Sequence, residues 1–429
     1  MAEKVEFYRE TEFKDTEIGR IPKEWEVVKL GEVCTKIKAG GTPLTSKKEY
    51  YNGNIPFVKI EDMTSSYKYI KSTLTSITEA GLKNSSAWLV PVKSLLVAMY
   101  GSIGAIAINE IEVATNQAIL AILPNNEKTN VEFLFYLLTH LKPLLKKHAK
   151  QTTQANLTAE IIKNFKIALP KYFEQQRIAE ILSTIDEAIR KTDEAIAKTE
   201  RLKKGLMQEL LTKGIGHKEF KDTEIGRIPK EWEVLELGDE KITVFIKSGN
   251  TPSKEIQEYW NGGILFVTQG DMTKVNKYLY ETSEKITELG LKNFNLFIIP
   301  ENSILLSMYG TIGKVVINKN PVTVSQNIAA IKLNNKNADQ EYFFYAIQYY
   351  SFQFKKKAKI STMKHLNIKI VKKIYLPLPS LQEQQQIALI ISTVDKKLGI
   401  LKQEKVKLER IKQWFMEELL TGRIRVRVS

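Results

Sequence analysis

The side chains that most often carry out chemistry are few and scattered in this sequence of 429 residues. There is one cysteine, Cys34, so no disulfide can form within the chain. The histidines, His140, His148, His217 and His365, do not correspond between the two halves of the chain and belong to no Cys/His cluster with zinc spacing. The sequence therefore predicts no metal site and no nucleophile–base pair.

The glycine-rich segments also lack a cofactor pattern. Gly310–Lys314 (GTIGK) does not have the G-x-x-x-x-G-K-[ST] spacing of a phosphate loop. No strand-linked G-x-G-x-x-G loop is visible, and no Asn/Asp-Pro-Pro-aromatic signature of an amino-methyltransferase. The segments Gly101–Gly104 (GSIG) and Gly310–Gly313 (GTIG) resemble a KH-type G-x-x-G only superficially, and we interpret them as buried tight turns. We expect no catalytic residue and no cofactor in this chain.

The composition is that of a globular protein with excess positive charge. Hydrophobic residues make up 43% and charged residues 26%, and the length allows two or more domains. The net charge of +15 favours a polyanionic partner, most often nucleic acid, although a lysine-rich surface can also serve solubility.

We expect a cytoplasmic protein, because a single cysteine suits a reducing cytosol. The N-terminal segment MAEKVEFYRE is too polar for a signal peptide. The apolar stretch Ser94–Ile108 is short for a membrane span and contains two glycines. We expect this stretch to form a buried strand and turn, and we expect no membrane partner.

The chain is one unit of about 209 residues written twice, with an offset of 207 for its first matching segment and 209 for the later ones. The segment EFKDTEIGRIPKEWEV occurs at Glu12–Val27 and again, letter for letter, at Glu219–Val234. Further matching segments follow at an offset of 209: EYYNG and EYWNG (Glu49, Glu258), ITEAGLKN and ITELGLKN (Ile77, Ile286), MYGSIG and MYGTIG (Met99, Met308), EQQRIA and EQQQIA (Glu174, Glu383). Because solenoid repeats have about 20–50 residues, this is a tandem duplication of a whole domain.

A long amphipathic helix is predicted at the end of each unit. Apolar residues recur there at mixed spacings of three and four, as in a coiled coil. Prolines precede each helix, in Leu169-Pro170 and in Leu376–Ser380, and Gly214 and Gly422 end them. At about 1.5 Å per residue each helix is roughly 55–60 Å long, and its natural partner is the other copy. The predicted seam comprises Ile178, Leu182, Ile185, Ile189, Ile196, Leu202, Leu206, Leu210, Ile387, Ile391, Val394, Leu398, Leu401, Leu408, Ile411, Phe415 and Leu419.

A mixed α/β globule is predicted between the repeated segment and each helix. Short runs rich in Val, Ile, Phe and Tyr alternate there with turn signals, and IPFVKI and AIAIN are typical strands. Val131–Ala149 is predicted to be a helix with a basic end. The fold class is therefore α+β, with the predicted domains 1–170 (first globule), 171–213 (central long helix), 214–379 (second globule) and 380–429 (C-terminal long helix).

This order of globule and helix resembles the specificity subunits of type I restriction–modification systems, the HsdS family. The resemblance rests on GxIPxxW at the start of each unit (Gly19, Ile21, Pro22, Trp25; Gly226, Ile228, Pro229, Trp232), on KAGGTP and KSGNTP, and on LPxxxEQ before each helix. QTTQANL (Gln151–Leu157) is close to the family's G-T-x-Q-x-x-L segment. The second copy departs from it with KISTMKHL (Lys359–Leu366), where Met363 cannot repeat the hydrogen bonding of Gln154.

The resemblance implies two target recognition domains, each recognising one half of a split double-stranded DNA site. It implies two helical regions that pair antiparallel, separate the domains and dock two modification (methylase) subunits. Methyl transfer, ATP-driven translocation and cleavage would belong to modification and restriction subunits, which would hold the S-adenosylmethionine, ATP and Mg²⁺. Two alternatives remain: a free-standing duplicated DNA-binding regulator without methylase partners, and an enzyme whose motif is not visible.

Polar residues in strand-edge loops are the candidate DNA contacts, because recognition in the major groove needs hydrogen-bonding side chains at the surface. The divergent segments Pro56–Tyr69 and Leu265–Tyr278 would face different half-sites, whereas the identical segments would present one docking surface twice. Recent duplication with uneven drift also accounts for the identity. The candidates are Lys38, Thr42, Lys59, Glu61, Tyr100, Ser102, Asn116, Gln117, Thr153 and Gln154 in the first unit, and Lys247, Thr251, Thr268, Gln269, Tyr309, Thr311, Gln326 and Asn327 in the second.

Overall fold

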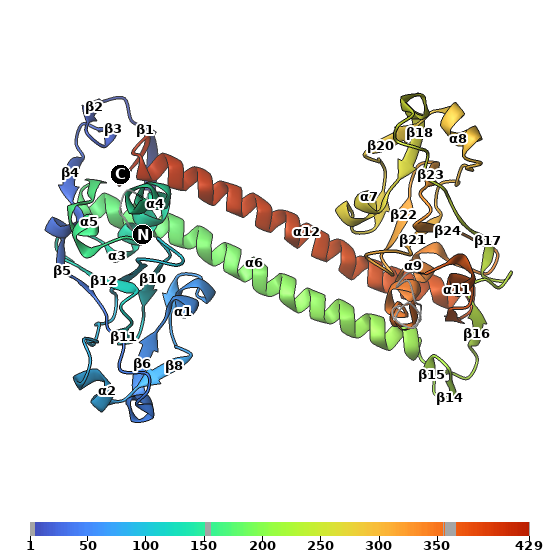
Figure 1. The fold of residues 1–429 in the computed structure, drawn as a ribbon, viewed down its shortest axis with the longest axis horizontal. Helices are drawn as coiled ribbons and strands as arrows, with labels where there is room; N and C mark the ends of the chain where they lie inside the picture. Colours follow the sequence, from blue (N-terminus) through green and yellow to red (C-terminus); the bar gives the residue numbers. More distant parts are fainter. Residues whose placement is uncertain (1–4, 151–155, 355, 357–365, 429) are drawn as a thin grey trace. The chain divides into compact units, whose positions relative to one another are not determined.

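The chain divides into two compact units, and the computed structural model describes residues 5–150, 156–354, 356 and 366–428. The first unit contains Met1–Asp193 together with Gln403–Ser429, and the second contains Glu194–Lys402. Each unit therefore holds one globule and a part of both long helices (Figure 1).

The first globule contains a five-stranded and a three-stranded sheet. Its strands are β5 (Cys34–Ala39), β6 (Tyr51–Val58), β7 (Tyr69–Ile70), β8 (Thr75–Ile77), β9 (Leu95–Ala98), β10 (Ile106–Asn109), β11 (Ala114–Thr115) and β12 (Ile119–Pro124). The strand orders are β5-β12-β9-β10-β7 and β11-β6-β8. Short helices α1 (Ile60–Ser65), α2 (Glu79–Lys83) and α5 (Ala159–Asn164) connect them.

The second globule repeats this topology. Its strands are β17 (Thr243–Ser248), β18 (Trp260–Val267), β19 (Tyr278–Leu279), β20 (Glu284–Ile286), β21 (Ile304–Ser307), β22 (Val315–Asn318), β23 (Val322–Val324) and β24 (Ile328–Leu333). The orders are β17-β24-β21-β22-β19 and β20-β18-β23. The short helices are α7 (Gln269–Lys274), α8 (Glu288–Asn293) and α11 (Ile368–Lys372).

The predicted strands are confirmed, and one predicted helix is corrected. IPFVKI lies largely in β6, and Ser94–Ile108 forms β9, a turn and part of β10. The single helix predicted at Val131–Ala149 is two helices, α3 (Val131–His140) and α4 (Lys142–Lys150). Pro143 explains the break, because proline has no N–H to donate and its ring clashes with the preceding turn. The counterpart of α3 in the second globule is α9 (Gln340–Tyr349).

The two long helices are α6 (Tyr172–Thr212) and α12 (Leu381–Leu420), of 41 and 40 residues. Each is followed by a glycine with positive φ, 67° at Gly214 and 70° at Gly422, as the sequence predicts. Within each unit the helices run antiparallel. In the first unit Lys412 bonds Asp186 at 2.6 Å and Lys405 bonds Asp193 at 2.7 Å, and in the second Lys203 bonds Asp395 at 2.6 Å and Lys402 bonds Glu200 at 2.7 Å.

The residues of the predicted apolar seam are buried to different degrees. Leu202 and Ile411 were expected in the seam but are 54% and 44% exposed, whereas Thr192 and Thr199 are buried. A helix of 3.6 residues per turn drifts relative to a 3.5-residue repeat, so the apolar stripe rotates away from the partner. The buried seam residues are Ile178, Leu182, Ile189, Leu210, Ile387, Ile391, Leu398 and Leu419, and the half-buried ones are Ile185, Ile196, Leu206, Val394, Leu401, Leu408 and Phe415.

Each copy of the identical segment forms a hairpin that packs on an end of the helix pair. The hairpins are β2 (Phe13–Thr16) with β3 (Gly19–Pro22), and β14 (Phe220–Thr223) with β15 (Gly226–Pro229). The buried Trp25 donates from its indole N–H to Glu174 at 3.2 Å, and Trp232 donates to Glu383 at 2.9 Å. A Cβ on Gly422 would lie 3.1 Å from the Trp25 ring, and one on Gly214 would lie 2.6 Å from the Trp232 ring. The hairpin thus contacts the start of one long helix and the end of the other.

The C-terminal region is not only helix, which corrects the prediction for 380–429. After α12, strand β26 (Ile424–Val428) pairs antiparallel with the first strand, β1 (Val5–Arg9). The buried Arg425 bonds Glu174 and Glu10 at 2.6 Å and Glu24 at 3.1 Å. Strand β4 (Glu26–Lys29) pairs with β13 (Lys166–Leu169), and β16 (Glu233–Glu236) pairs with β25 (Tyr375–Leu378). These two strand pairs attach each globule to the start of a long helix.

Candidate nucleic-acid interface

Several candidate contacts of the first globule lie on loops that are tied to one another. The backbone N–H of Gly41 donates to the carbonyl of Thr115 at 2.9 Å, and the Thr42 hydroxyl donates to Gln117. Gly40 permits this approach, because a Cβ there would lie 2.0 Å from the Thr115 carbonyl oxygen. The segment after β5 is thereby held against the turn between β11 and β12, which also carries Asn116.

The Tyr100–Gly104 loop lies beside α1. Gly101 and Gly104 have φ of 69° and 71°, so the predicted tight turn is confirmed. The prediction that it is buried is wrong, because Gly101 and Ser102 are exposed. A Cβ on Gly101 would contact Ile60, the neighbour of Lys59 and Glu61. Tyr100 and Ser102 therefore belong to the same loop cluster as these two residues.

The second globule builds the same cluster with different side chains. The Thr251 hydroxyl donates to Gln326, as Thr42 does to Gln117. Gln269 of α7 donates from its side-chain amide to the Thr311 hydroxyl at 3.1 Å and to the carbonyl of Tyr309. Ile60 occupies the position that corresponds to Gln269 in the first unit. The loop cluster of the second globule is therefore joined by hydrogen bonds of Gln269, which the apolar Ile60 of the first globule cannot form.

The candidate residues within the described ranges all have accessible side chains, although some of them form hydrogen bonds with other residues of the chain. None of those within the described ranges is classed as buried. The Thr268 hydroxyl donates to Asp271 at 2.7 Å, and the Asn116 side-chain oxygen accepts from the Ala118 N–H at 3.0 Å, so these two serve local structure. Thr153 and Gln154 lie outside the described residues, as does Met363. The flanking Leu157 and Leu366 donate from their N–H to the carbonyls of Met99 and Met308 at 2.9 Å.

A buried six-residue polar cluster joins the first globule to both long helices. Lys68, only 3% exposed, donates to Glu132 at 3.0 Å and to Tyr136 at 3.1 Å. Tyr136 in turn donates to Asp186 of α6 at 2.6 Å, and Asp186 accepts from Lys412 of α12 at 2.6 Å. Tyr69, the sixth member, donates to Glu132. Burial lowers the pKa of Lys68, and the attraction of Glu132 only partly offsets this.

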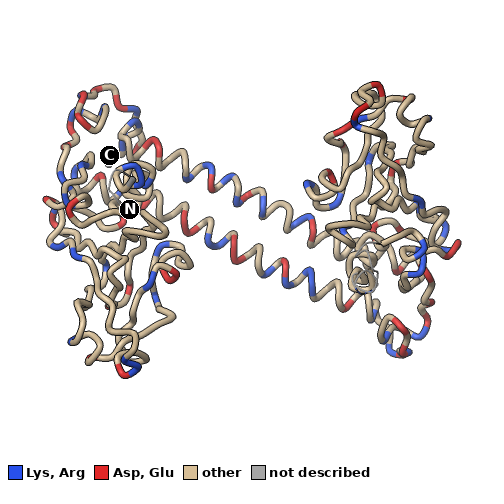
Figure 2. Tube along the Cα trace, viewed as in Figure 1, with Lys and Arg blue, Asp and Glu red and all other residues tan. Residues whose placement is uncertain are grey.

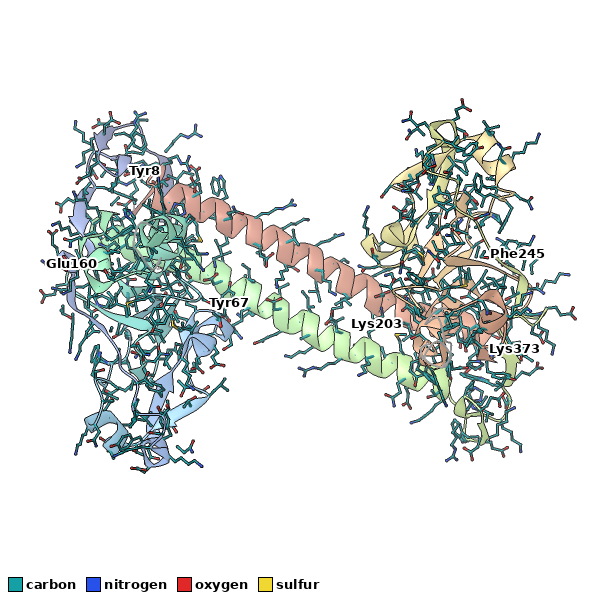
Figure 3. All side chains as sticks on the ribbon, in the orientation of Figure 1. Tyr8, Tyr67, Glu160, Lys203, Phe245 and Lys373 are labelled. Carbon is teal, nitrogen blue, oxygen red and sulfur yellow. The ribbon has the colours of Figure 1, made fainter. Side chains whose placement is uncertain are left out.

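The second unit contains the same cluster at an offset of 209. There the aspartate comes from α12 and the second lysine from α6, the reverse of the first unit. Lys277 bonds Glu341 and Tyr345, and Tyr345 donates to Asp395 of α12 at 3.1 Å. Asp395 accepts from Lys203 of α6 at 2.6 Å, and Tyr278 donates to Glu341. Figure 3 shows Lys203 on α6 within this unit. Each globule is thus attached to the helix pair through the same six residue types, and in the first unit Ser183 adds hydrogen bonds to Lys68 and Glu132.

Comparison with known protein families gives a match over most of the chain. The model of the type I restriction modification DNA specificity domain matches residues 22–200 and again residues 229–410. The chain belongs to this family. The two matched ranges correspond to the two halves of the duplication, so the chain carries two specificity domains in tandem.

Curated relatives of the specificity-domain family match from end to end. One is the putative type I restriction enzyme MjaX specificity subunit of Methanocaldococcus jannaschii, 31% identical, with 99% of each chain covered. Another is the MjaVIII specificity subunit of the same organism, 29% identical, with 99% of this chain and 98% of the relative covered. The chain spans essentially the full length of both relatives.

Solved structures of type I systems share the fold. The S subunit from M. genitalium aligns with a TM-score of 0.60 at 17% identity, covering 92% of this chain and 96% of that one. A chain from a structure described as showing complex assembly and conformational transition of the type I R-M system aligns with a TM-score of 0.55 at 18% identity, covering 94% and 99%. The tandem α+β globules with long helices are therefore the fold of this specificity-domain family.

The six-residue cluster is the part of this specificity-domain chain that inspection of motifs missed. Its members are a lysine, two tyrosines, a glutamate, an aspartate and a second lysine, each repeated at an offset of 209. A comparison of polar positions between the copies would have found them, since buried charged groups must keep their partners. Among the described residues, no group of His, Cys, Asp and Glu could hold a metal ion, and no helix is long and apolar enough to cross a membrane.

Proposed function

We propose that this chain is the DNA specificity subunit of a type I restriction–modification complex, with each globule recognising one half of a bipartite double-stranded site. The observation that carries the proposal is the presence of two full DNA specificity domains in one chain. The loop clusters of the two globules share a backbone scaffold but differ in side chains, as at Ile60 and Gln269. Two unlike half-sites fit two unlike loop clusters on one scaffold.

The identical hairpins and the paired helices support docking of two modification subunits. Burial requires Trp25 and Trp232 to be kept, but it does not require identity at the surface. Asp15, Glu17 and Arg20 are exposed, and their copies Asp222, Glu224 and Arg227 are exposed and identical. Two equal surfaces at two helix-pair ends would accept two copies of one partner. The continuous helices between the globules would set the spacer between the half-sites.

Catalysis is assigned to the partner subunits. The chain itself supplies recognition and docking, and the methyl donor S-adenosylmethionine would bind the modification subunits. ATP and Mg²⁺ would serve the restriction subunits where these join the complex. A free-standing regulator would share the charge and the duplication, but it would have no use for two identical exposed hairpin surfaces.

The experiment is to map modified bases in host DNA and in plasmid treated with the purified chain, with and without its modification subunits. We expect methylation at one bipartite site only when the modification subunits are present. Site-specific DNA binding without methylation is expected for the chain alone. Methylation by the single chain, free of other subunits, would contradict the proposal, because no cofactor loop is visible in the sequence.

A further inference from the structure

A lysine-lined groove lies in the second unit between the globule and the helix pair. Its volume is about 930 Å³. Residues of α6, α12, α9, β19 and the start of β22 form its walls. The charged residues that line it are Lys203, Lys204, Lys277, Lys314, Lys396 and Lys402 against Glu200 and Asp395. Figure 2 shows lysine and arginine positions on both helices within this unit.

Within the described ranges, three of these lysines form no ion pair with a carboxylate. Lys203 bonds Asp395, Lys277 bonds Glu341, and Lys402 bonds Glu200. For Lys204, Lys314 and Lys396, no ion pair links the side chain to any carboxylate in the described part of the chain. Lys314 donates to the carbonyl of Val275 at 2.8 Å. Burial lowers the pKa of Lys314, and the charge of Lys203 lowers it further, so an anion bound beside Lys314 would favour its charged form.

Four of the six groove lysines have no lysine or arginine at the corresponding position of the first unit. Lys204, Lys314 and Lys396 correspond to Gln413, Ala105 and Glu187, and Lys402 corresponds to Asp193. Asn276, which lines the groove, corresponds to Tyr67. The hydroxyl of Tyr67 donates to Asp186 at 2.9 Å, and Figure 3 shows this side chain beside α6. The two units therefore differ in the charge of this region, and a larger side chain, Tyr67, takes the place of Asn276 in the first unit.

The groove adjoins the loop cluster of its own globule. Lys314 directly follows the Tyr309–Gly313 loop, and Val275, which accepts its hydrogen bond, directly follows α7. Both segments carry candidate base contacts, Thr311 and Gln269. A DNA duplex bound at the loop cluster would continue past this edge, so backbone phosphates are the anions that the groove would meet first.

We propose that this groove binds the phosphate backbone of DNA beside the half-site of the second globule, and that the first globule has no equivalent phosphate site. The inference rests on the proposed DNA recognition and adds an asymmetry to it. Lys204, Lys314 and Lys396 supply the contacts, and each phosphate neutralised releases condensed counterions. Binding of the second half-site then depends more steeply on salt than binding of the first.

The test uses the full chain and a labelled duplex that carries the site methylated in the host. The variant Lys204→Gln/Lys396→Gln is compared with the matched control Lys198→Gln/Lys397→Gln, which changes exposed lysines on the same helices outside the groove. We expect the slope of log K against log salt to become shallower by about 0.9 per groove lysine removed. The control should keep the slope of the unaltered chain. Phosphate ethylation interference should weaken beside one half-site only.

The outcomes separate the groove from the proposed function. An unchanged slope in the groove variant, or an equal loss in the control, would overturn the phosphate site. Loss of assembly with the modification subunits at an unchanged slope would do the same, since the groove would then bind an acidic protein surface. Failure of the unaltered chain to prefer its site would instead refute the proposed function.

Discussion

The two units share the contacts that attach the globule to the long helices, and they differ in the residues of their exposed loops. Both contain the lysine–glutamate–tyrosine–aspartate cluster that joins globule to helices, and both contain a buried tryptophan bonded to the first glutamate of a long helix. They differ in the loops around Ile60 and Gln269. The residues that orient each globule are the same in both units, whereas the candidate DNA contacts are partly the same, as at Thr42 and Thr251, and partly different, as at Lys59 and Thr268.

The two units differ in the side chain that bonds the first glutamate of each long helix, Glu174 or Glu383. In the first unit Glu174 accepts from Arg425 of β26, the strand that pairs with β1. In the second unit His217 bonds Glu383 at 2.9 Å instead. The glutamate and tryptophan are constant, whereas the second side chain that bonds the glutamate is an arginine in one unit and a histidine in the other. The position therefore requires a hydrogen-bonding partner for the glutamate, not a particular residue.

The largest expected effect comes from exchanging the variable part of one unit. Replacement of residues 30–165 with the matching part of a relative leaves β4 and β13 as the fixed ends. It also leaves Trp25 bonded to Glu174 and β1 paired with β26. We expect one half-site to change completely while the other stays the same, as measured by methylation mapping with the modification subunits. Change in both half-sites, or in neither, would show that the globules do not recognise DNA independently.

A second prediction concerns the shared polar cluster. Glu132→Ala leaves Lys68 buried without its carboxylate, and Glu341→Ala does the same to Lys277. The Lys68 side chain is 4% exposed and that of Lys277 is 11% exposed. We therefore expect the free energy of unfolding to fall by about 2 kcal/mol in the first unit and by roughly half of that in the second.

Hydrogen exchange in peptides covering α3 and α9 measures the two effects separately. The exposed Glu61→Ala is the control and should change neither peptide. Equal protection in α3 before and after Glu132→Ala would show that the cluster does not hold the globule in place.

Much of the scaffold could be predicted because the duplication and the residues that start and end the helices can be identified in the sequence. The offset of 209, the prolines before each long helix and the glycines after it locate the helices to within two residues. The pairing of β1 with β26 could not be predicted, because it joins the two ends of the chain through long-range contacts that no local pattern encodes. The exposure of Leu202 depends on helix drift over many turns, which a list of apolar spacings does not capture.

The candidate site was only partly predictable for a related reason. Strand-edge loops were located from turn residues, and Thr42 and Gln117 do contact each other. The lysine groove combines residues from five elements, and no local spacing in the sequence brings Lys204, Lys314 and Lys396 together. Comparison of the two copies position by position would have shown their charge difference, although not that they share a surface.

A third prediction tests the helices as a ruler between the two units. Four residues are inserted between Asp193 and Glu194 and four between Lys402 and Gln403, where one unit ends and the other begins. Four helical residues add about 6 Å and turn the helix about 40° beyond a full turn, so the seam is roughly kept. At about 3.4 Å per base pair, we expect a spacer longer by one or two pairs with unchanged half-sites. Methylation mapping of an active complex with an unaltered spacer would show that the helices do not set the distance.

The smallest expected effect is a pH dependence of the first unit's cluster. Burial raises the pKa of Glu132, but hydrogen bonds from Ser183 and Tyr69 and the charge of Lys68 outweigh it, so its pKa lies below the ordinary 4.5. A carboxyl with a lowered pKa in the folded state stabilises the protein fully above the unfolded value and loses that contribution as pH falls through the folded value. Protection of α3 should therefore decline below about pH 4.5. Because other carboxyls titrate in the same range, the decisive quantity is the difference between the unaltered chain and Glu132→Gln. That difference should be largest near neutral pH and shrink on acidification, and a difference that stays constant from pH 7 to the acid limit would contradict the assignment of a charged Glu132 beside Lys68.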